Sequence, residues 1–120
     1  MQTKPVLEID EYGNKFWYLN GDFHRTDGPA IEYANGDKRW FLNGVRHRTD
    51  GPAVEYANGN IGWFRNDKLH REDGPAVEYA NGDKRWCLDG TEYTFGKWLE
   101  LTPLSEKEKL KLSLKYAMRI

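Results

Sequence analysis

The sequence contains one cysteine, two serines and no long apolar run. Because a lone cysteine, Cys87, cannot form an internal disulfide, we expect the protein to work in a reducing compartment. No segment approaches the roughly 20 apolar residues that a membrane-spanning helix needs. The start of the chain carries acidic residues where a signal peptide needs an apolar stretch. These absences predict a small soluble protein of the cytoplasm.

A strong charge of either sign is also missing. Lysine and arginine total 18 against 19 acidic residues, for a net charge of −1 with histidine neutral. Proteins that live on duplex DNA or RNA usually carry a clear basic excess, so we do not expect a nucleic-acid partner. The 38% hydrophobic and 31% charged residues are ordinary for a folded chain, and 120 residues suit one domain.

Four tryptophans spaced 23 residues apart reveal an internal repeat: Trp17, Trp40, Trp63 and Trp86. Three full copies, at 17–39, 40–62 and 63–85, share thirteen of their 23 positions, and a fourth departs after the letters WCLDG. Self-similarity at such a period indicates an array in which each unit buries its apolar surface on its neighbours.

Each copy places Ala-Asn-Gly between segments rich in β-branched and aromatic residues, at 34–36, 57–59 and 80–82. Asn-Gly in this setting favours a β-hairpin with a two-residue type I′ turn, in which both turn residues have positive φ. With Asn35 and Gly36 as that turn, Glu32 faces Arg39.

The same register makes further predictions about faces and pairs. It sets Glu78 opposite Arg85 and Gly62 opposite Glu55. Alternation along the strands then divides the side chains into a core side and a mixed side. The core side carries Ile31, Tyr33, Trp40 and Leu42, and the mixed side carries Ala30, Glu32, Arg39 and Phe41.

A second turn in each unit is the run His-Arg-x-Asp-Gly-Pro-Ala, at 24–30, 47–53 and 70–76. Asp can cap its own turn, Gly supplies an unusual φ, and Pro ends the strand ladder. Helices do not fit, since Asn-Gly and Gly-Pro would break each one twice per unit. The predicted fold class is mainly β: a single-layer antiparallel meander of repeated β-hairpins with a helical C-terminal cap.

The pattern W-x-x-N-G-x-x-H-R-x-D-G-P-A-v-E-Y-A-N-G-D resembles a variant of the MORN repeat (membrane occupation and recognition nexus), with a likeness that covers residues 12–90. The His-Arg-x-Asp-Gly-Pro-Ala motif is similar to motifs in small repeat proteins of large bacteriophages and giant viruses. The resemblance implies a binding module. A viral source would place the protein in the host cytoplasm.

The two ends differ from the repeats. Residues 5–16 look like the second half of a degenerate repeat unit, in which 12–15 align with 35–38. The segment that precedes 12–15 is expected to pair as the first strand of the sheet. We divide the chain into a repeat array, 1–91, and a helical C-terminal cap, 92–120.

Within the cap, Thr94 to Leu101 predicts a short helix that Thr102 and Pro103 interrupt. Ser105 and Glu108 have capping-box spacing for a second helix over about 106–118. Its apolar stripe carries Leu110, Leu114, Ala117 and Met118. The helical tail covers the end or face of the sheet in one interpretation and binds a partner in the other.

Three repeated histidines, His24, His47 and His70, suggest metal binding or base catalysis. Equivalent residues in adjacent hairpins lie two strands apart, roughly 9–10 Å, whereas zinc holds each histidine nitrogen at about 2.0–2.1 Å. They cannot converge on one ion, so we expect structural turn histidines, no metal and no cofactor. Cys87 replaces an aromatic residue and is expected to pack as a small hydrophobe. No arrangement for nucleophilic catalysis is present, and we expect no enzyme activity.

Repetition suits binding, because identical side chains at a fixed pitch make an extended surface of one chemistry. One candidate row combines exposed aromatic residues with arginines, both enriched at interfaces: Tyr18, Phe41, Phe64, Arg39 and Arg85. The second row sets arginines beside the histidines: Arg25, Arg48 and Arg71 with His24, His47 and His70. The alternative is that the aromatics are covered and the arginines pair with acidic residues.

The leading functional hypothesis is a non-enzymatic protein–protein interaction module. The viral resemblance implies that its partner is a host protein, such as a defence or toxin component that it inhibits. MORN resemblance implies lipid-headgroup binding instead, although the near-neutral charge supplies no strong basic field. A third hypothesis is capture of a nucleotide-like ligand between aromatics and arginines. Open sheet edges also allow a homodimer.

Overall fold

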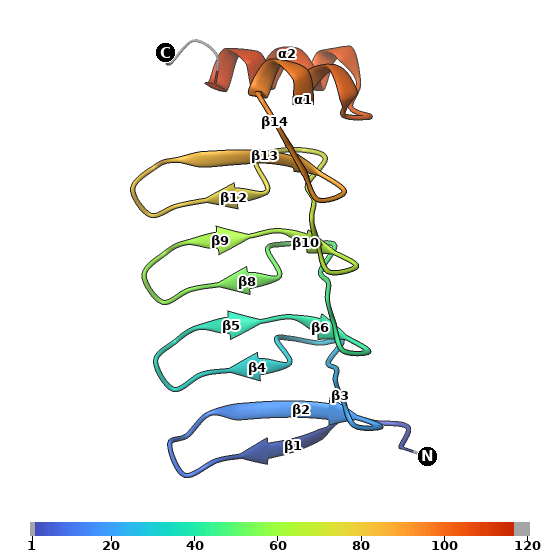
Figure 1. Cartoon of the computed structure of the whole chain (residues 1–120), viewed down its shortest axis with the longest axis vertical. Helices are drawn as coiled ribbons and strands as arrows, with labels where there is room; N and C mark the ends of the chain where they lie inside the picture. The colour runs from blue at the N-terminus through green and yellow to red at the C-terminus, as the bar shows by residue number, and fades with distance from the viewer. Residues whose placement is uncertain (1, 117–120) are drawn as a thin grey trace.

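The structure is a computed structural model that describes residues 2–116. It is an elongated stack of hairpins, 48 × 30 × 21 Å, that rises from the N-terminal strand to two C-terminal helices (Figure 1). The elements are β1 Val6–Ile9, β2 Lys15–Leu19, β3 Asp22–Phe23, β4 Ile31–Glu32, β5 Lys38–Arg39, β6 Phe41–Leu42, β7 Val45–Arg46, β8 Val54–Glu55, β9 Ile61–Gly62, β10 Phe64–Arg65, β11 Lys68–Leu69, β12 Val77–Glu78, β13 Lys84–Leu88, β14 Thr91–Tyr93, α1 Phe95–Leu101 and α2 Glu106–Tyr116.

The predicted fold class is confirmed. The main sheet is antiparallel and follows the order β1-β2-β4-β5-β8-β9-β12-β13-β14, with β3 beside β2. The pairs β6-β7 and β10-β11 form small separate ladders. The degenerate N-terminal unit supplies the first strand, as expected, because β1 pairs with β2 from Val6 opposite Tyr18 to Ile9 opposite Lys15.

The predicted register of the Ala-Asn-Gly hairpin is wrong by one residue. Ile31 faces Arg39 and Glu32 faces Lys38. The turn contains three residues, because the Tyr33 N–H donates to the Asp37 carbonyl at 2.9 Å and the Gly36 N–H donates to the Tyr33 carbonyl at 3.0 Å. Only Gly36 has positive φ, at 101°. A one-residue slip changes which side chains share a face, so Ile31 lies with Arg39 and not with Trp40.

The two-residue turns occur near the start of each unit, at Asn-Gly in the first two units, Asn-Asp in the third and Asp-Gly in the partial fourth. Asn20 and Gly21 both have positive φ, 52° and 86°, and flanking Leu19 pairs with Asp22. The equivalent turns have positive φ at both positions as well: 43–44, 66–67 and 89–90. Each unit therefore contains two hairpins, where the sequence predicted one hairpin and a longer turn.

Side chains as well as strands join each unit to the next. A side-chain oxygen just after the hairpin glycine accepts a hydrogen bond from the next hairpin's backbone: Asn14 from Ala34, Asp37 from Ala57 and Asn60 from Ala80, each at 2.7 Å. The buried residues are correspondingly small and recur once per unit: Ala30, Ala53 and Ala76, followed by Ile31, Val54 and Val77. A single layer of short strands thus gains its order from links between neighbouring units.

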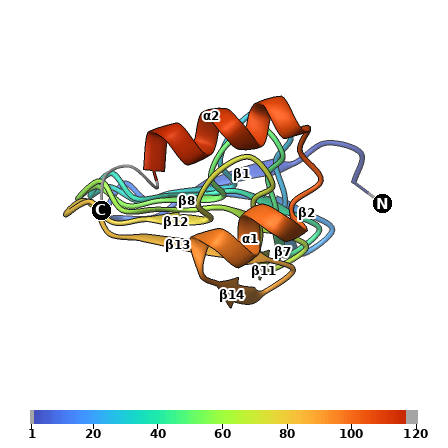
Figure 2. The same ribbon diagram turned by 90° about the horizontal axis from the view of Figure 1, so that it is seen from above.

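The helices cover the C-terminal end of the array (Figures 1 and 2). Trp98 of α1 is fully buried, and its ring centroid lies 4.7 Å from that of Trp86 on β13. Phe95 and Tyr116 also contact Trp86, at 4.6 and 5.0 Å. The Trp98 indole N–H donates to the Arg71 carbonyl at 3.1 Å. The helical tail therefore caps the last strands, as the sequence predicted.

The second helix keeps its predicted start but not a buried stripe. Ser105 and Glu108 form the expected capping box, with the Glu108 N–H donating to Ser105 Oγ at 3.2 Å. Leu110 and Leu114 are 60% and 57% exposed, so the predicted stripe faces away from the array. Its other two members, at 117 and 118, lie outside the described residues. No helix within 2–116 is long and apolar enough to cross a membrane.

Candidate functional site

The sheet presents two chemically different faces. The loop face carries Trp17, Trp40 and Trp63 with the His-Arg-x-Asp-Gly-Pro loops. The tyrosine face carries Tyr33, Tyr56 and Tyr79, beside the row formed by Arg39, Gly62 and Arg85. Each face has arginines over aromatic rings, and the two sets differ in what else the arginines bind.

On the loop face, each loop arginine stacks on the tryptophan of its own unit. The guanidinium carbons of Arg25, Arg48 and Arg71 lie 3.9, 4.0 and 4.0 Å from the ring centroids of Trp17, Trp40 and Trp63. Arginine over an indole face is a favourable cation–π geometry. The repeated tryptophan and the repeated arginine are therefore one structural pair.

The same guanidinium groups are saturated by acceptors within the loop. Arg48 donates from Nε to Asp50 and from Nη1 to both the Pro52 carbonyl and Glu55, each at 3.0 Å. Arg25 and Arg71 make the equivalent three contacts. The predicted cross-strand pair of Glu32 with Arg39 is accordingly wrong, since Glu32 pairs with Arg25.

The loop glycine makes room for the arginine. A Cβ at Gly51 would lie 2.6 Å from Cζ of Arg48, closer than real Cβ atoms approach another heavy atom. The equivalent distances at Gly28 and Gly74 are 2.8 and 2.7 Å. None of these three glycines has positive φ, so space and not backbone conformation explains their repetition.

The histidines link consecutive units. His47 Nδ1 accepts a hydrogen bond from the Asn66 backbone N–H at 3.1 Å. His24 and His70 accept in the same way from Asn43 and Asp89. Each ring thus serves a different pair of units. Within residues 2–116, no three His, Cys, Asp or Glu side chains form a group able to hold a metal.

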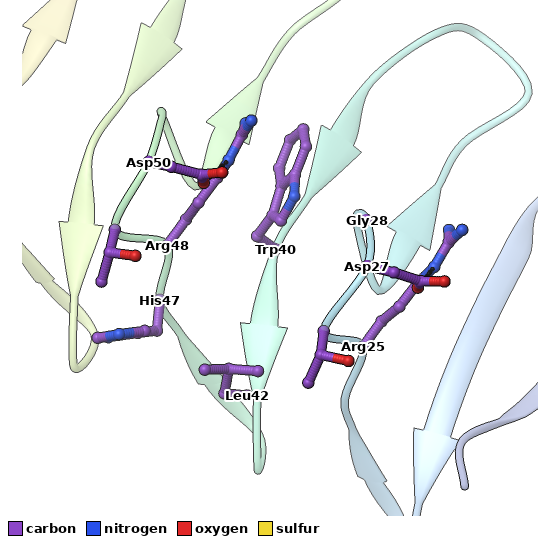
Figure 3. A pocket seen from close by; sticks show the side chains of 10 residues that line it. Arg25, Asp27, Gly28, Trp40, Leu42, His47, Arg48 and Asp50 are labelled. Carbon is purple, nitrogen blue, oxygen red and sulfur yellow. Dashed lines mark hydrogen bonds and ion pairs between the residues drawn. The ribbon is translucent and has the colours of Figure 1, made fainter.

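Grooves lie between successive loops on this face. The larger, of about 620 Å³, runs between the loops of Arg25 and Arg48 and is also lined by Trp40 and Leu42. Figure 3 shows both arginines extended in the same direction, each beside its own aspartate and not toward the other. The next groove, of about 540 Å³, has a similar lining with Arg65 in place of Leu42, and Leu104 and Glu108 of the cap line it as well. The loop arginines that line the two grooves already donate hydrogen bonds to acceptors within their own loops.

On the tyrosine face, Arg39 lacks such acceptors. Its guanidinium carbon lies 5.7 Å from the Tyr33 ring and 5.5 Å from the Tyr56 ring. Among the described residues, no carboxylate lies within ion-pair distance of it, and its buried Nε has no hydrogen-bond partner. A buried donor without an acceptor costs about 1–3 kcal/mol. Arg39 is therefore a cation that the fold positions but does not neutralise.

A hollow of about 240 Å³ opens beside Arg39, where Gly62 replaces the arginine of the neighbouring units. We call it the Gly62 hollow. Gly62 faces Val54, and not Glu55 as the sequence predicted. A Cβ at Gly62 would lie 3.2 Å from the Phe64 ring, so the missing side chain allows Phe64 to close over the backbone.

Two further arginines line the Gly62 hollow, and each is paired with an exposed acidic side chain that is not part of the lining. Arg46 lies 4.2 Å from the Phe64 ring centroid and contacts Asp67 at 2.6 Å, a hydrogen bond that lowers the pKa of the Asp67 carboxyl. Arg85 contacts Glu92 at 3.1 Å, and hydrogen bonds to Glu92 and Tyr79 raise the pKa of Arg85. Within the part of the chain that the structure describes, no carboxylate lines the hollow itself.

The structure separates the first predicted binding row into two groups. Phe64, Arg39 and Arg85 meet at the Gly62 hollow. Tyr18 and Phe41 belong instead to an aromatic cluster around Phe23, with centroids 4.9 and 5.4 Å from it. The second row of arginines and histidines is held by the contacts within and between loops.

Sequence reasoning missed Tyr56, Arg46 and Gly62. Gly62 carried a usable signal, because both neighbouring copies have arginine at its position. Cys87, at 1% exposure, is buried as expected, and burial raises the pKa of its thiol.

Comparison of the chain with protein-family models, with curated proteins and with solved structures found no match. The MORN resemblance therefore stays a prediction, and the chemistry of the two faces carries the functional inference.

Proposed function

We propose that the protein is a non-enzymatic protein–protein interaction module and that the tyrosine face is its binding surface. The observation that carries the proposal is Arg39: it is held between two tyrosine rings with no acceptor among the described residues. Arginine and tyrosine are the residues most often found at the energetic centres of protein interfaces.

The surroundings of Arg39 support this assignment. Tyr56 and Tyr79 are 41% and 37% exposed and stand at the Gly62 hollow together with Phe64. Rigid aromatic side chains around a small hollow offer contact area with little loss of side-chain entropy. On the loop face, the guanidinium groups of Arg25, Arg48 and Arg71 are occupied by acceptors within each loop.

The chemistry-bearing groups favour binding over catalysis. Each histidine uses Nδ1 to accept from a different backbone N–H, and the only cysteine is buried. An active site needs several different groups that converge on one reacting atom. The repeated residues here serve the fold once per unit.

The test is affinity capture from host lysate, followed by mass spectrometry, with variants of both faces. Tyr56→Ser removes an exposed ring at the Gly62 hollow, and we expect it to abolish capture of any stoichiometric protein bound by the wild type. Tyr12→Ser is the matched control, because Tyr12 is 73% exposed at the N-terminal hairpin tip.

A third variant probes the loop face. Thr26→Glu combined with Thr49→Glu places in the larger groove the residue that the third unit already carries as Glu72. We expect this variant to capture the partner as well as the wild type does. Loss of capture with the loop-face variant but not with Tyr56→Ser would reverse the assignment of faces, and no captured protein at all would contradict the interaction module.

A further inference from the structure

We propose that the Gly62 hollow binds a side-chain carboxylate presented by an apolar segment of the partner protein. This inference rests on the proposed interaction function and names the chemistry that the tyrosine face recognises. It follows from the charge, the size and the walls of the hollow.

The positive charge of the hollow is only partly compensated. Arg39, Arg46 and Arg85 line it, and no carboxylate of the described residues does. Arg46 contacts Asp67 and Arg85 contacts Glu92, and these two acidic side chains are 56% and 51% exposed. Arg39 alone has no ion pair among the described residues. Since a planar guanidinium matches a carboxylate through two parallel hydrogen bonds, one free arginine calls for one carboxylate.

The size and walls of the hollow favour a side chain over a whole small molecule. Its volume of about 240 Å³ lies below the roughly 300–1,000 Å³ typical of small-molecule sites. Val54, Val77 and Phe64 supply apolar walls, which suit the stem of an acidic residue and an apolar neighbour. A nucleotide would leave its base outside these walls.

Gly62 is the specificity-determining position. The equivalent residues in the neighbouring units are Arg39 and Arg85, whose long side chains would occupy the space. The glycine lets Phe64 approach the backbone and leaves the space beside Arg39 unfilled. The middle of the array thus differs from its neighbours at the position where a ligand would enter.

The experiment is an NMR titration of the full chain with two blocked tripeptides, acetyl-Leu-Glu-Leu-amide and acetyl-Leu-Gln-Leu-amide. The reporters are the Arg39 Nε–H signal and the Gly62 amide signal. We expect both signals to shift in a saturable way with the glutamate peptide. Binding of the glutamine peptide should be about tenfold weaker, because it lacks the charge that strengthens hydrogen bonds to arginine.

Two variants make the result specific. Arg39→Gln should remove the preference for glutamate. Lys38→Gln makes the same change of charge on the neighbouring residue, which points to the opposite face beside Glu32, and it should keep the preference. Backbone amide spectra of both variants report whether the fold is retained, and Gly62→Ala provides a second test in which the hollow narrows and binding weakens.

The outcomes separate this inference from the proposed function. Equal shifts with both peptides, or no shift at Arg39 and Gly62 up to the solubility limit, would overturn the carboxylate site. A partner captured by the wild type and by Arg39→Gln, but not by Tyr56→Ser, would leave the interaction module standing and remove the carboxylate site. Loss of capture with Arg39→Gln and retention with Lys38→Gln would support both.

Discussion

The two faces of the sheet use the same pair of residue types for different purposes. On the loop face, Arg48 stacks on Trp40 and is surrounded by three acceptors from its own unit. On the tyrosine face, Arg39 lies between two tyrosines and has no such acceptor among residues 2–116. Whether an arginine over an aromatic ring is structural or is available to bind a partner therefore depends on the hydrogen-bond acceptors around it.

The repeat pattern follows the same division. Arg48, Trp40 and the loop residues that contact Arg48 are identical in all three full copies, and each makes a contact within its own unit. At the Gly62 hollow the tyrosine recurs in every copy, but one position differs, as arginine, glycine and arginine at 39, 62 and 85. The residues of the loops are therefore scaffold in every unit, whereas the divergence at position 62 gives the tyrosine face of the middle unit a hollow that its neighbours lack.

The largest expected effect lies at the C-terminal end, where a tryptophan replaces the stacked arginine. Trp98 covers Trp86 as Arg48 covers Trp40, and it is fully buried. Trp98→Ala should lower the free energy of unfolding by about 3–5 kcal/mol, as measured by urea denaturation. Leu110→Ala, on the exposed side of α2, is the control and should change it little.

Arg48→Ala should have the next largest effect. It removes the stack on Trp40 and leaves Asp50, Glu55 and the Pro52 carbonyl without their donor. We expect a loss of about 2–3 kcal/mol in the free energy of unfolding. A loss as small as that of a surface substitution would show that the loop assembly does not stabilise the unit.

Gly51→Ala tests whether the glycine serves the arginine. Its Cβ would displace the Arg48 guanidinium, so we expect a loss of about 1–2 kcal/mol in the wild type. In the Arg48→Ala background the same change should cost little, because the displaced group is absent. Urea denaturation of the four proteins in this double-mutant cycle measures the coupling. Additive effects would contradict the steric explanation.

The fold was largely predictable because the 23-residue period and the Asn-Gly turns can be recognised from short stretches of sequence. The choice between the two turn sites was not, since in the first two units both sites read Asn-Gly. In the structure the Asn35 side chain accepts from the Asp37 N–H at 2.9 Å, which favours a turn without positive φ at Asn35. The type I′ turn falls instead at Asn43 and Gly44, and the error displaced the register by one residue.

The candidate site was predictable only in part. Residue type alone placed Arg39 and Arg48 in the same class of interface arginines. Their difference arises from contacts between segments far apart in space and sequence, such as Arg39 with the ring of Tyr56. Local patterns do not report which acceptors a long side chain reaches.

Arg39→Ala sharpens the comparison from the other face. Because Arg39 has no ion pair among the described residues and its ring contacts are long, we expect a loss below about 1 kcal/mol. Urea denaturation beside Arg48→Ala makes the contrast direct. A loss as large as that of Arg48→Ala would mean that Arg39 is a structural residue, and would weaken its assignment to a binding surface.

The smallest expected effect is a dependence on acid. The hydrogen bond from Arg25, together with its charge, lowers the pKa of the Asp27 carboxyl. A carboxyl whose pKa is lower in the folded state stabilises the fold above its unfolded pKa, near 4, and this contribution is lost as the pH falls through the folded pKa. As the pH falls from about 5 to 3, the free energy of unfolding should therefore decrease less for Asp27→Asn than for the wild type, as measured by urea denaturation at each pH. Asp22→Asn removes an exposed acid that has no ion pair within residues 2–116, and it should follow the wild type. Equal losses in all three proteins would show that the loop arginine does not hold its aspartate in solution, and the contrast between the two faces would then rest on the tryptophan stack alone.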